Sequence, residues 1–232
     1  MRTKPIVISL AFIILLMWAV GAEYTADYWV QKGKDFYKND SYELALNCYN
    51  KSVDIDPKNA DAWIGIGYTN IYWTHGKYNE SLKAFDNAVK IDPLSISAWI
   101  GKGIVLSNQH RYEEALDAYD NAIQINPQYA ETWNFRGKVF EALGNYNESL
   151  KAYDKAIELD PKCCPYYWED KGNLLSSLGR YNESLAVYDN AIALNPHDAL
   201  AWNCKGLALK SLGRTTEADA AFAKAKELGY KG

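Results

Sequence analysis

Five asparagines in this chain begin an Asn-X-Ser triplet, which is the acceptor for an N-linked glycan. They are Asn39, Asn50, Asn79, Asn147 and Asn182. The last three belong to a repeated pentapeptide, Tyr-Asn-Glu-Ser-Leu, whose copies start at residues 78, 146 and 181. The first two copies start 68 residues apart and the last two start 35 residues apart. These distances are close to two periods and one period of a repeat of about 34 residues. The triplets are candidate glycosylation sites in an exported protein, and their spacing indicates an internal repeat.

Residue types that bind metals or perform catalysis are scarce. The chain has three histidines, His75, His110 and His197, and we expect His75 and His110 to lie in turns. Two ligands are too few for a zinc site. The sequence has no nucleophile–base motif, P-loop or dinucleotide fingerprint. We therefore expect a protein without a metal, a cofactor or catalytic activity.

The four cysteines allow one of two alternative disulfides, which share Cys164, without requiring either. Cys48 is distant in sequence from Cys163, Cys164 and Cys204. A Cys164–Cys204 bond and a vicinal Cys163–Cys164 bond both remain open, because an exported chain permits disulfides. Zinc is disfavoured because no pair has C-x2-C spacing.

Composition and charge describe a folded, mildly acidic protein. Of 232 residues, 48% are hydrophobic and 23% are charged, which is enough apolar surface for a core. The net charge is −4, and about −6 without Arg2 and Lys4. Nucleic-acid binding needs clustered basic residues, so it is disfavoured.

The N-terminus has the pattern of a targeting segment. Arg2 and Lys4 precede an uncharged run over residues 5–22, and Glu23 comes directly after it. The positive-inside rule keeps the two basic residues cytoplasmic and exports the remainder of the chain. Residues 1–22 are then either a signal peptide, cleaved after Ala22, or an uncleaved membrane anchor of about 20 residues. The chain is expected to be secreted or membrane-anchored, with residues 23–232 extracytoplasmic.

The rest of the chain repeats with a period of about 34 residues. Tryptophan opens each unit, at Trp29, Trp63, Trp99, Trp133, Trp168 and Trp202. Glycine follows four residues later, at Gly33, Gly67, Gly103, Gly137, Gly172 and Gly206. An aromatic residue recurs twenty residues into the regular units, at Tyr49, Phe85, Tyr119, Tyr153, Tyr188 and Phe222. Proline closes the first five units, at Pro57, Pro93, Pro127, Pro161 and Pro196.

This pattern resembles the tetratricopeptide repeat (TPR) family over residues 26–232. The resemblance implies an all-α, right-handed α-solenoid of six helix–turn–helix repeats. The units are residues 26–59, 60–95, 96–129, 130–164, 165–198 and 199–232. The position before the glycine departs from the family pattern, because five units carry a basic residue there: Lys32, Lys102, Arg136, Lys171 and Lys205.

Local residues support a hairpin in each unit. Leu-Gly at 143–144, 178–179 and 212–213 is expected to end a first helix, and Asp-Pro or Asn-Pro a second helix. A glycine on the first helix is expected to face a small residue on the second. These small residues are Ala45, Ser81, Ala115, Ser149, Ser184 and Ala218. Asp219 and Lys226 stand where earlier units have docking aliphatic residues, so we expect the stack to end there.

The basic position suggests ion pairs within each hairpin. Lys102, Arg136 and Lys171 are each about level with an acid on the second helix of their own unit. The expected partners are Asp120, Asp154 and Asp189.

In this family the first helices line a concave groove that receives a peptide or a partner helix. The resemblance implies an apolar patch of Ile64, Tyr68, Ile71, Ile100 and Ile104 in repeats two and three. It implies a polar stretch of Asn134, Lys138, Glu169, Asn173 and Asn203 in repeats four to six. Tyr72 and Trp73 have no role in the repeat pattern and are further contact candidates.

The function that fits these observations best is a non-catalytic scaffold, exported across or tethered to the membrane, that captures a protein segment in its groove. Two alternatives stay open. One is an accessory protein of the envelope that binds a glycan or solute, and the other is a structural spacer without a specific ligand.

Overall fold

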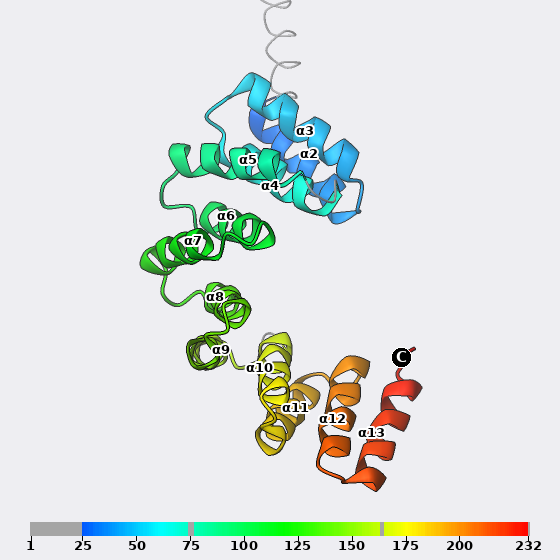
Figure 1. Cartoon of the computed structure of the whole chain (residues 1–232). Helices are drawn as coiled ribbons and strands as arrows, with labels where there is room; N and C mark the ends of the chain where they lie inside the picture. The colour runs from blue at the N-terminus through cyan, green and yellow to red at the C-terminus, as the bar shows by residue number, and fades with distance from the viewer. Residues whose placement is uncertain (1–24, 74–76, 163–164, 232) are drawn as a thin grey trace, which may run out of the picture. The chain divides into compact units, whose positions relative to one another are not determined.

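The computed structural model describes residues 25–73, 77–162 and 165–231, and over these residues the chain is all α-helix and turn, without a strand (Figure 1). The twelve helices of this described part are α2 (Ala26–Lys38), α3 (Tyr42–Ile55), α4 (Ala60–Trp73), α5 (Tyr78–Ile91), α6 (Ile96–Asn108), α7 (Tyr112–Ile125), α8 (Ala130–Ala142), α9 (Tyr146–Leu159), α10 (Pro165–Ser177), α11 (Tyr181–Leu194), α12 (Ala199–Ser211) and α13 (Thr215–Glu227). An all-α helical repeat solenoid is therefore confirmed.

The expected signals end the helices. Gly144, Gly179 and Gly213 have φ of +75°, +73° and +74°, and each lies just beyond the end of a first helix. Glycine adopts this left-handed conformation without the steric cost that a side chain adds. The five second helices that precede a proline stop one residue before the Asp-Pro or Asn-Pro pair, because proline disfavours helical geometry in the residue before it.

The chain divides into two compact units between α6 and α7. Unit 1 ends at Gln109 and contains α2 to α6, and unit 2 begins at His110 and contains α7 to α13.

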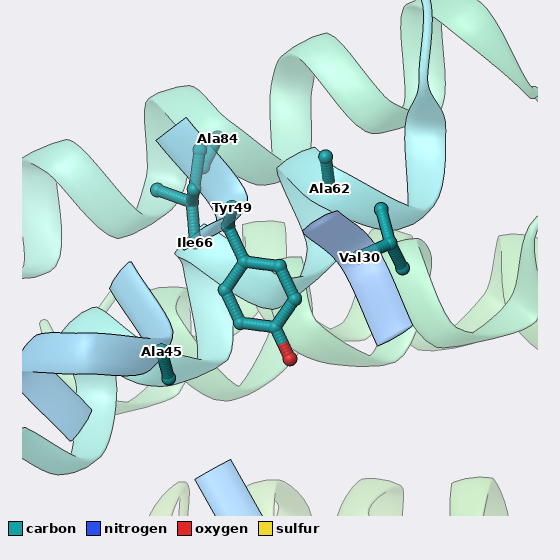
Figure 2. Close-up of a cluster of buried hydrophobic side chains, with 6 residues drawn as sticks. All are labelled: Val30, Ala45, Tyr49, Ala62, Ile66 and Ala84. Atoms are coloured by element: carbon teal, nitrogen blue, oxygen red, sulfur yellow. The ribbon is translucent and has the colours of Figure 1, made fainter. Parts of the chain in front are cut away.

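The repeated glycine lies against the repeated aromatic ring. A Cβ on Gly33 would come within 2.6 Å of the Tyr49 ring, and the same distance separates a Cβ on Gly67 from the Phe85 ring. Small residues are buried between the helices, as expected, but the aromatic ring is what requires a glycine here. Tyr49 illustrates the result, since its ring lies among apolar residues of α2, α3, α4 and α5 (Figure 2).

In unit 1 a second set of glycines brings the next first helix onto the same rings. A Cβ on Gly65 would lie 2.5 Å from the Tyr49 ring, and one on Gly101 would lie 2.2 Å from the Phe85 ring. Side chains do not approach this closely, so α4 and α6 pack backbone against ring.

The tryptophans fix the turns between repeats. Their indole Nε1 atoms donate hydrogen bonds to the carbonyl oxygens of the prolines six or seven residues earlier, at 2.9–3.3 Å. The pairs are Trp63–Pro57, Trp99–Pro93, Trp133–Pro127, Trp168–Pro161 and Trp202–Pro196. Tryptophan and proline therefore recur together because each turn uses both.

The expected ion pairs within hairpins are wrong. Four of the five basic side chains, from Lys102 onward, instead pair with the second helix of the preceding repeat. The pairs are Lys102–Asp86 and Arg136–Asp120 at 2.8 Å, and Lys171–Asp154 and Lys205–Asp189 at 2.5 Å. We call these four pairs the ion-pair ladder.

The ladder also explains where the basic pattern stops. Ile66 and Asn50 hold the two corresponding positions between the first and second repeats, so neither partner is charged. Ala223 holds the acidic position in the sixth repeat, so this position is uncharged there. Charge is therefore present on both sides of a junction or on neither.

Two expectations about the ends have different outcomes. Asp219 and Lys226 are exposed on α13, in agreement with their expected solvation. The expected signal peptide or anchor over residues 1–22 lies outside the described residues. Within the described part of the chain, no helix is long and apolar enough to cross a bilayer.

Candidate partner-binding site

In each unit the first helices of neighbouring repeats contact one another. In unit 1, α4 contacts both α2 and α6, and in unit 2, α10 contacts both α8 and α12. Neighbouring second helices make no such contacts within either unit over the described residues. Each unit is therefore narrower on its first-helix side, and we call this surface the inner face.

The apolar residues expected on the inner face of unit 1 differ in accessibility. Ile64, Ile71 and Ile104 are half-buried, and a partner can reach them. Ile100 is only 4% exposed and belongs to the core. Tyr68 already uses its hydroxyl within the fold, because that hydroxyl donates a hydrogen bond to the Ser97 carbonyl oxygen at 3.1 Å.

Tyr72 and Trp73 end α4 as exposed aromatic residues. Tyr72 is 53% exposed and Trp73 is 39% exposed. The Tyr72 ring meets the Tyr37 ring edge to face, with 6.2 Å between ring centroids. Tyr72 is thus held in place while much of its surface stays accessible, which suits a contact residue.

The inner face of unit 2 contains a polar cavity of about 370 Å³ between α8, α9 and α10. Its lining residues are Lys138, Glu141, Ala142, Tyr153, Asp170 and Asn173. Asp170 lies at the repeat position that Gly65 and Gly101 occupy in unit 1. Asp170 therefore places a carboxylate at this position where unit 1 has bare backbone, although the Tyr153 ring is itself fully buried, at 0% exposed.

Two side chains of α8 hold Asp170. The Lys138 ammonium lies 2.8 Å from Asp170 Oδ2, and Asn134 Nδ2 donates to the same oxygen at 2.9 Å. Asn134 is only 1% exposed, and its Oδ1 has no hydrogen-bond partner among the described residues. Asn134 was expected to contact a bound segment, but in this structure it positions Asp170 instead.

Of the other polar residues expected here, Asn173 has a hydrogen-bond partner and Asn203 is only partly buried. Asn173 is exposed and its Oδ1 accepts a hydrogen bond from the Tyr188 hydroxyl at 2.8 Å, while Asn203 is half-buried. The Tyr153 hydroxyl donates to Glu141 Oε2 at 2.8 Å. Burial and the nearby Glu141 carboxylate raise the pKa of Tyr153, so it stays a neutral donor.

Among the carboxyl groups on this face, Glu169 has the pKa that is shifted furthest from its ordinary value. Burial, a hydrogen bond with Asp198 and repulsion by the Asp198 and Asp170 carboxylates raise the pKa of Glu169 to about 7. Asp198 is the N-cap of α12, where its Oδ1 accepts from the amides of Leu200 and Ala201. The sequence placed Glu169 on this face but gave no sign of the carboxyl pair. The one indication in the sequence is Asp198, an acidic residue directly before the first helix of the next repeat.

The glycosylation candidates are exposed. Asn79, Asn147 and Asn182 are each the second residue of a second helix, Asn50 lies within α3, and Asn39 caps α2. The serines of four triplets are fully buried: Ser52, Ser81, Ser149 and Ser184. Packing therefore accounts for these serines, and glycan occupancy stays a prediction.

The cysteines and histidines form no described site. Cys48 and Cys204 are free thiols, and burial raises the pKa of each. Cys163, Cys164 and His75 lie outside the described residues, so the vicinal disulfide remains untested. No group of histidine, cysteine or acidic residues within the described ranges could hold a metal ion.

Comparison with known families accounts for most of the chain. Tetratricopeptide repeat models match residues 60–93, 96–129, 130–163 and 199–228. A further TPR repeat model matches residues 33–70 and 172–213. The chain belongs to the tetratricopeptide repeat family. No curated protein sequence matches this TPR chain.

Solved structures share its fold at low sequence identity. A structure titled "Functional Characterization of Pseudomonas Aeruginosa pilF" aligns with a TM-score of 0.76 and 20% identity, over 91% of this chain and 95% of that one. YrrB, titled a TPR protein with an unusual peptide-binding site, aligns with a TM-score of 0.57 and 20% identity, over 78% and 92%. A thermophilic TPR protein from Thermus thermophilus, TTC0263, aligns with a TM-score of 0.65 and 22% identity, over 84% and 100%. These likenesses show that the fold is shared. The family match, and not these structures, supports a scaffold fold that generally mediates protein–protein interaction.

Proposed function

We propose that this TPR protein is a non-catalytic scaffold that binds a segment of a partner protein on its inner face. The observation that carries the proposal is the side-by-side packing of first helices in each unit. Within each unit, this packing presents a continuous surface built from preformed helices. Side chains fixed on preformed helices lose little entropy when a partner binds, which favours affinity.

The two units offer different contacts to a partner. Unit 1 supplies half-buried isoleucines and the exposed aromatic residues Tyr72 and Trp73, which suit apolar anchor side chains. Unit 2 supplies charged groups around its cavity, which suit polar side chains.

Site-specific photo-crosslinking in the native host tests this proposal. A photoreactive residue replaces Ile64 or Lys138 on the inner faces, or Lys83 or Lys151, which are exposed on second helices. We expect the two inner-face positions to crosslink to a protein that the two control positions do not reach. Crosslinks only from residues 83 and 151, or from none of the four, would refute binding on the inner face.

We also propose that residues 5–22 export the array or tether it to the membrane. The support is the uncharged run between the basic residues Arg2 and Lys4 and the acidic residue Glu23. Secretion, membrane anchoring and an extracytoplasmic array all depend on this one feature.

Intact-mass analysis of protein from the native host tests export. Cleavage after Ala22, or glycan mass that maps to any Asn-X-Ser triplet, would support export. A full-length, unmodified chain in the cytoplasmic fraction would refute it.

A further inference from the structure

One basic residue of the repeat pattern has no carboxylate partner within the described chain. Lys32 of α2 holds the position of the four basic residues in the ion-pair ladder, each of which binds an aspartate on the second helix of the preceding repeat. No described helix precedes α2. The Lys32 ammonium instead lies 3.4 Å from the Tyr28 hydroxyl and 5.4 Å from the centre of the Trp29 ring.

A cavity of about 520 Å³ lies between α2 and α3 beside Lys32. Its lining includes apolar and charged side chains, which we call the α2–α3 surface: Trp29, Lys32, Phe36, Leu44, Lys51 and Asp54. The Lys51 ammonium lies 4.2 Å from the centre of the Trp29 ring and, like Lys32, forms no ion pair among the described residues. Two lysines against one aspartate favour an anionic group on this surface.

Leu44 adds an apolar contact where the repeat pattern has an acid. The five later repeats carry glutamate at its position, namely Glu80, Glu114, Glu148, Glu183 and Glu217. Leu44 is 49% exposed, and it borders the cavity together with the half-buried rings of Trp29 and Phe36. A single exposed leucine is ordinary, but here it extends an apolar surface that lies beside two lysines.

The later repeats show what covers a ladder residue. In α9 the covering helix carries Leu150, Asp154 and Ile157, and Asp154 binds Lys171 of α10. Residues at this spacing lie on one face of a helix. The helices α5, α7 and α11 have the same arrangement of leucine, aspartate and valine or isoleucine. A ligand that covers Lys32 in the same way is a helix with an acid between two aliphatic residues.

The last helix of a second copy of this chain does not fit that description. At the three equivalent positions α13 has Asp219, Ala223 and Lys226. It offers Lys32 no acid at the central position and places charges where the other helices dock aliphatic side chains. The chemistry therefore favours a helix of another protein over head-to-tail association.

We propose that the α2–α3 surface binds an amphipathic, acidic helix of a partner protein. The helix pairs a carboxylate with Lys32 and lays aliphatic side chains against Leu44 and Phe36, as amphipathic helices do in apolar grooves. This surface shares no residue with the inner-face candidates, so it is a second docking surface, independent of binding on the inner face.

A peptide with the sequence of α9, residues 146–159, is the probe. The helix α9 is chosen because it covers Asp170, a polar residue at the repeat position that Gln31 holds in α2. A hydrocarbon staple between positions 147 and 151, both exposed in this chain, holds the peptide helical and lowers the entropy cost of binding. Fluorescence anisotropy with the full chain gives the affinity, and the matched peptide carries Asp154→Asn.

Two variants of the full chain test the two kinds of contact. Lys32→Met keeps the apolar stem and removes the charge. Leu44→Glu introduces the residue that the five later repeats carry, so the fold should accept it. The controls are Lys83→Met on α5 and Leu94→Glu, which make the same changes at exposed sites outside the α2–α3 surface.

We expect the α9 peptide to bind the parent chain and both control variants equally. Lys32→Met and the Asn peptide should each weaken binding about 5-fold, as expected for a partly exposed ion pair. Their combination should weaken it no further, because each change breaks the same pair. Leu44→Glu should weaken binding by about 10-fold or more, because it removes an apolar contact.

Three outcomes would overturn the proposal. The first is no binding of the α9 peptide to the parent chain. The second is losses that add when Lys32→Met meets the Asn peptide, or that are as large in Leu94→Glu as in Leu44→Glu, since either shows only diffuse attraction. The third is self-association of the parent chain in sedimentation that Leu44→Glu abolishes, because the occupant is then a second copy. Photo-crosslinking from residues 64 and 138 is a separate readout, so binding on the inner face can hold when this surface fails.

Discussion

Unit 1 and unit 2 use the same repeat pattern but differ at the position two residues before the repeated glycine. In unit 1 that position is Gly65 and Gly101, and the backbone of the first helix closes over an aromatic ring. In unit 2 it is Phe135, Asp170 and Cys204. Phe135 stacks on Tyr119 with 5.9 Å between centroids, whereas Asp170 borders the cavity. The same position therefore carries bare backbone against a ring in unit 1, and in unit 2 a stacked ring at Phe135 or a carboxylate beside a polar cavity at Asp170.

The difference separates two kinds of positions in a repeat. The tryptophans from Trp63 onward all bond to a proline in the same way. The repeated glycines lie against the repeated aromatic rings at Gly33, Gly67, Gly137, Gly172 and Gly206, so these positions specify the fold. The position of Asp170 contacts the same ring but is free to vary, so it determines the chemistry of the inner face. In the cavity of unit 2, Asp170 is a residue of this second kind, whereas Tyr153 is one of the first.

The largest expected effect is at the closest approach in unit 1. Gly101→Ala would place a Cβ 2.2 Å from the Phe85 ring. We expect a loss of about 2–3 kcal/mol, because an overpacked core must shift backbone or ring. Urea unfolding of the full chain measures the loss, and hydrogen exchange should locate it in α5 and α6.

The matched change in unit 2 is Asp170→Ala, which adds no atom near a ring. It removes the pair with Lys138 and leaves Asn134 Nδ2 without its acceptor, so we expect a loss of about 1 kcal/mol. If Gly101→Ala instead raised stability, helix propensity would outweigh the clash, since alanine is favoured over glycine by about 1 kcal/mol.

The second prediction introduces an ion pair of the ladder at the junction between the first and second repeats, which lacks one. The double variant Asn50→Asp/Ile66→Lys creates the pair found at later junctions. Ile66 is 7% exposed and packs against Tyr49, so burying a lysine stem there forfeits apolar contact (Figure 2). We expect a net loss of about 1–2 kcal/mol in thermal or urea unfolding, because an exposed ion pair returns at most about 1 kcal/mol.

Asn50→Asp alone is the control and should change stability by less than about 0.5 kcal/mol, because Asn50 is exposed. A double variant as stable as the parent would mean that the charged and apolar junctions are interchangeable.

The sequence was sufficient for the fold because the period repeats six times. A single Trp-X3-Gly is weak, but its recurrence with an aromatic residue and a proline leaves few alternatives to a helical array. Helix ends were also predictable, because Leu-Gly and Asp-Pro act through local backbone geometry at residues such as Gly144 and Pro161.

Contacts between repeats were harder to predict. Arg136 was assigned to Asp154 of its own hairpin, yet it pairs with Asp120 of the preceding repeat, because spacing along one helix does not reveal which neighbour a long side chain reaches. The same limit applies to Asn134, whose burial depends on Asp170 of the next repeat. The carboxyl pair of Glu169 and Asp198 also joins two repeats, and so it had no signature in either one.

The third prediction concerns the stability cost of that carboxyl pair. The folded-state pKa of Glu169, about 7, lies above its ordinary value of 4.5. Between these values the folded state holds a proton that the unfolded state has lost, so this carboxyl favours folding at low pH and the benefit fades as pH rises through about 7. Glu169→Gln should therefore raise stability over the parent at pH 8 by about 1 kcal/mol, after discounting for a half-buried, solvent-screened group.

Parallel thermal melts of both proteins at pH 4.5 and pH 8 measure the difference. The gain should vanish at pH 4.5, where Glu169 is protonated in the folded state. Asp170→Asn serves as a comparison, because Lys138 and Asn134 stabilise that carboxylate and its loss should destabilise at pH 8. A gain from Glu169→Gln that is the same at both pH values would contradict the raised pKa.

The smallest expected effect concerns what the two units share. Lys102–Asp86 in unit 1 and Arg136–Asp120 in unit 2 are equivalent rungs with similar side-chain exposure, 28% and 50% against 25% and 47%. Asp86→Asn and Asp120→Asn should each cost about 0.5 kcal/mol at low salt and less at 1 M salt, because partly exposed pairs are weak and screened. Asp117→Asn, on the helix of Asp120 but without an ion pair among the described residues, is the control. Equal losses in the two units would show that the ladder holds both kinds of junction alike. A loss confined to one unit would mean that the surroundings of the pair, the glycines of unit 1 or the polar cavity of unit 2, change how much an equivalent ion pair stabilises the protein.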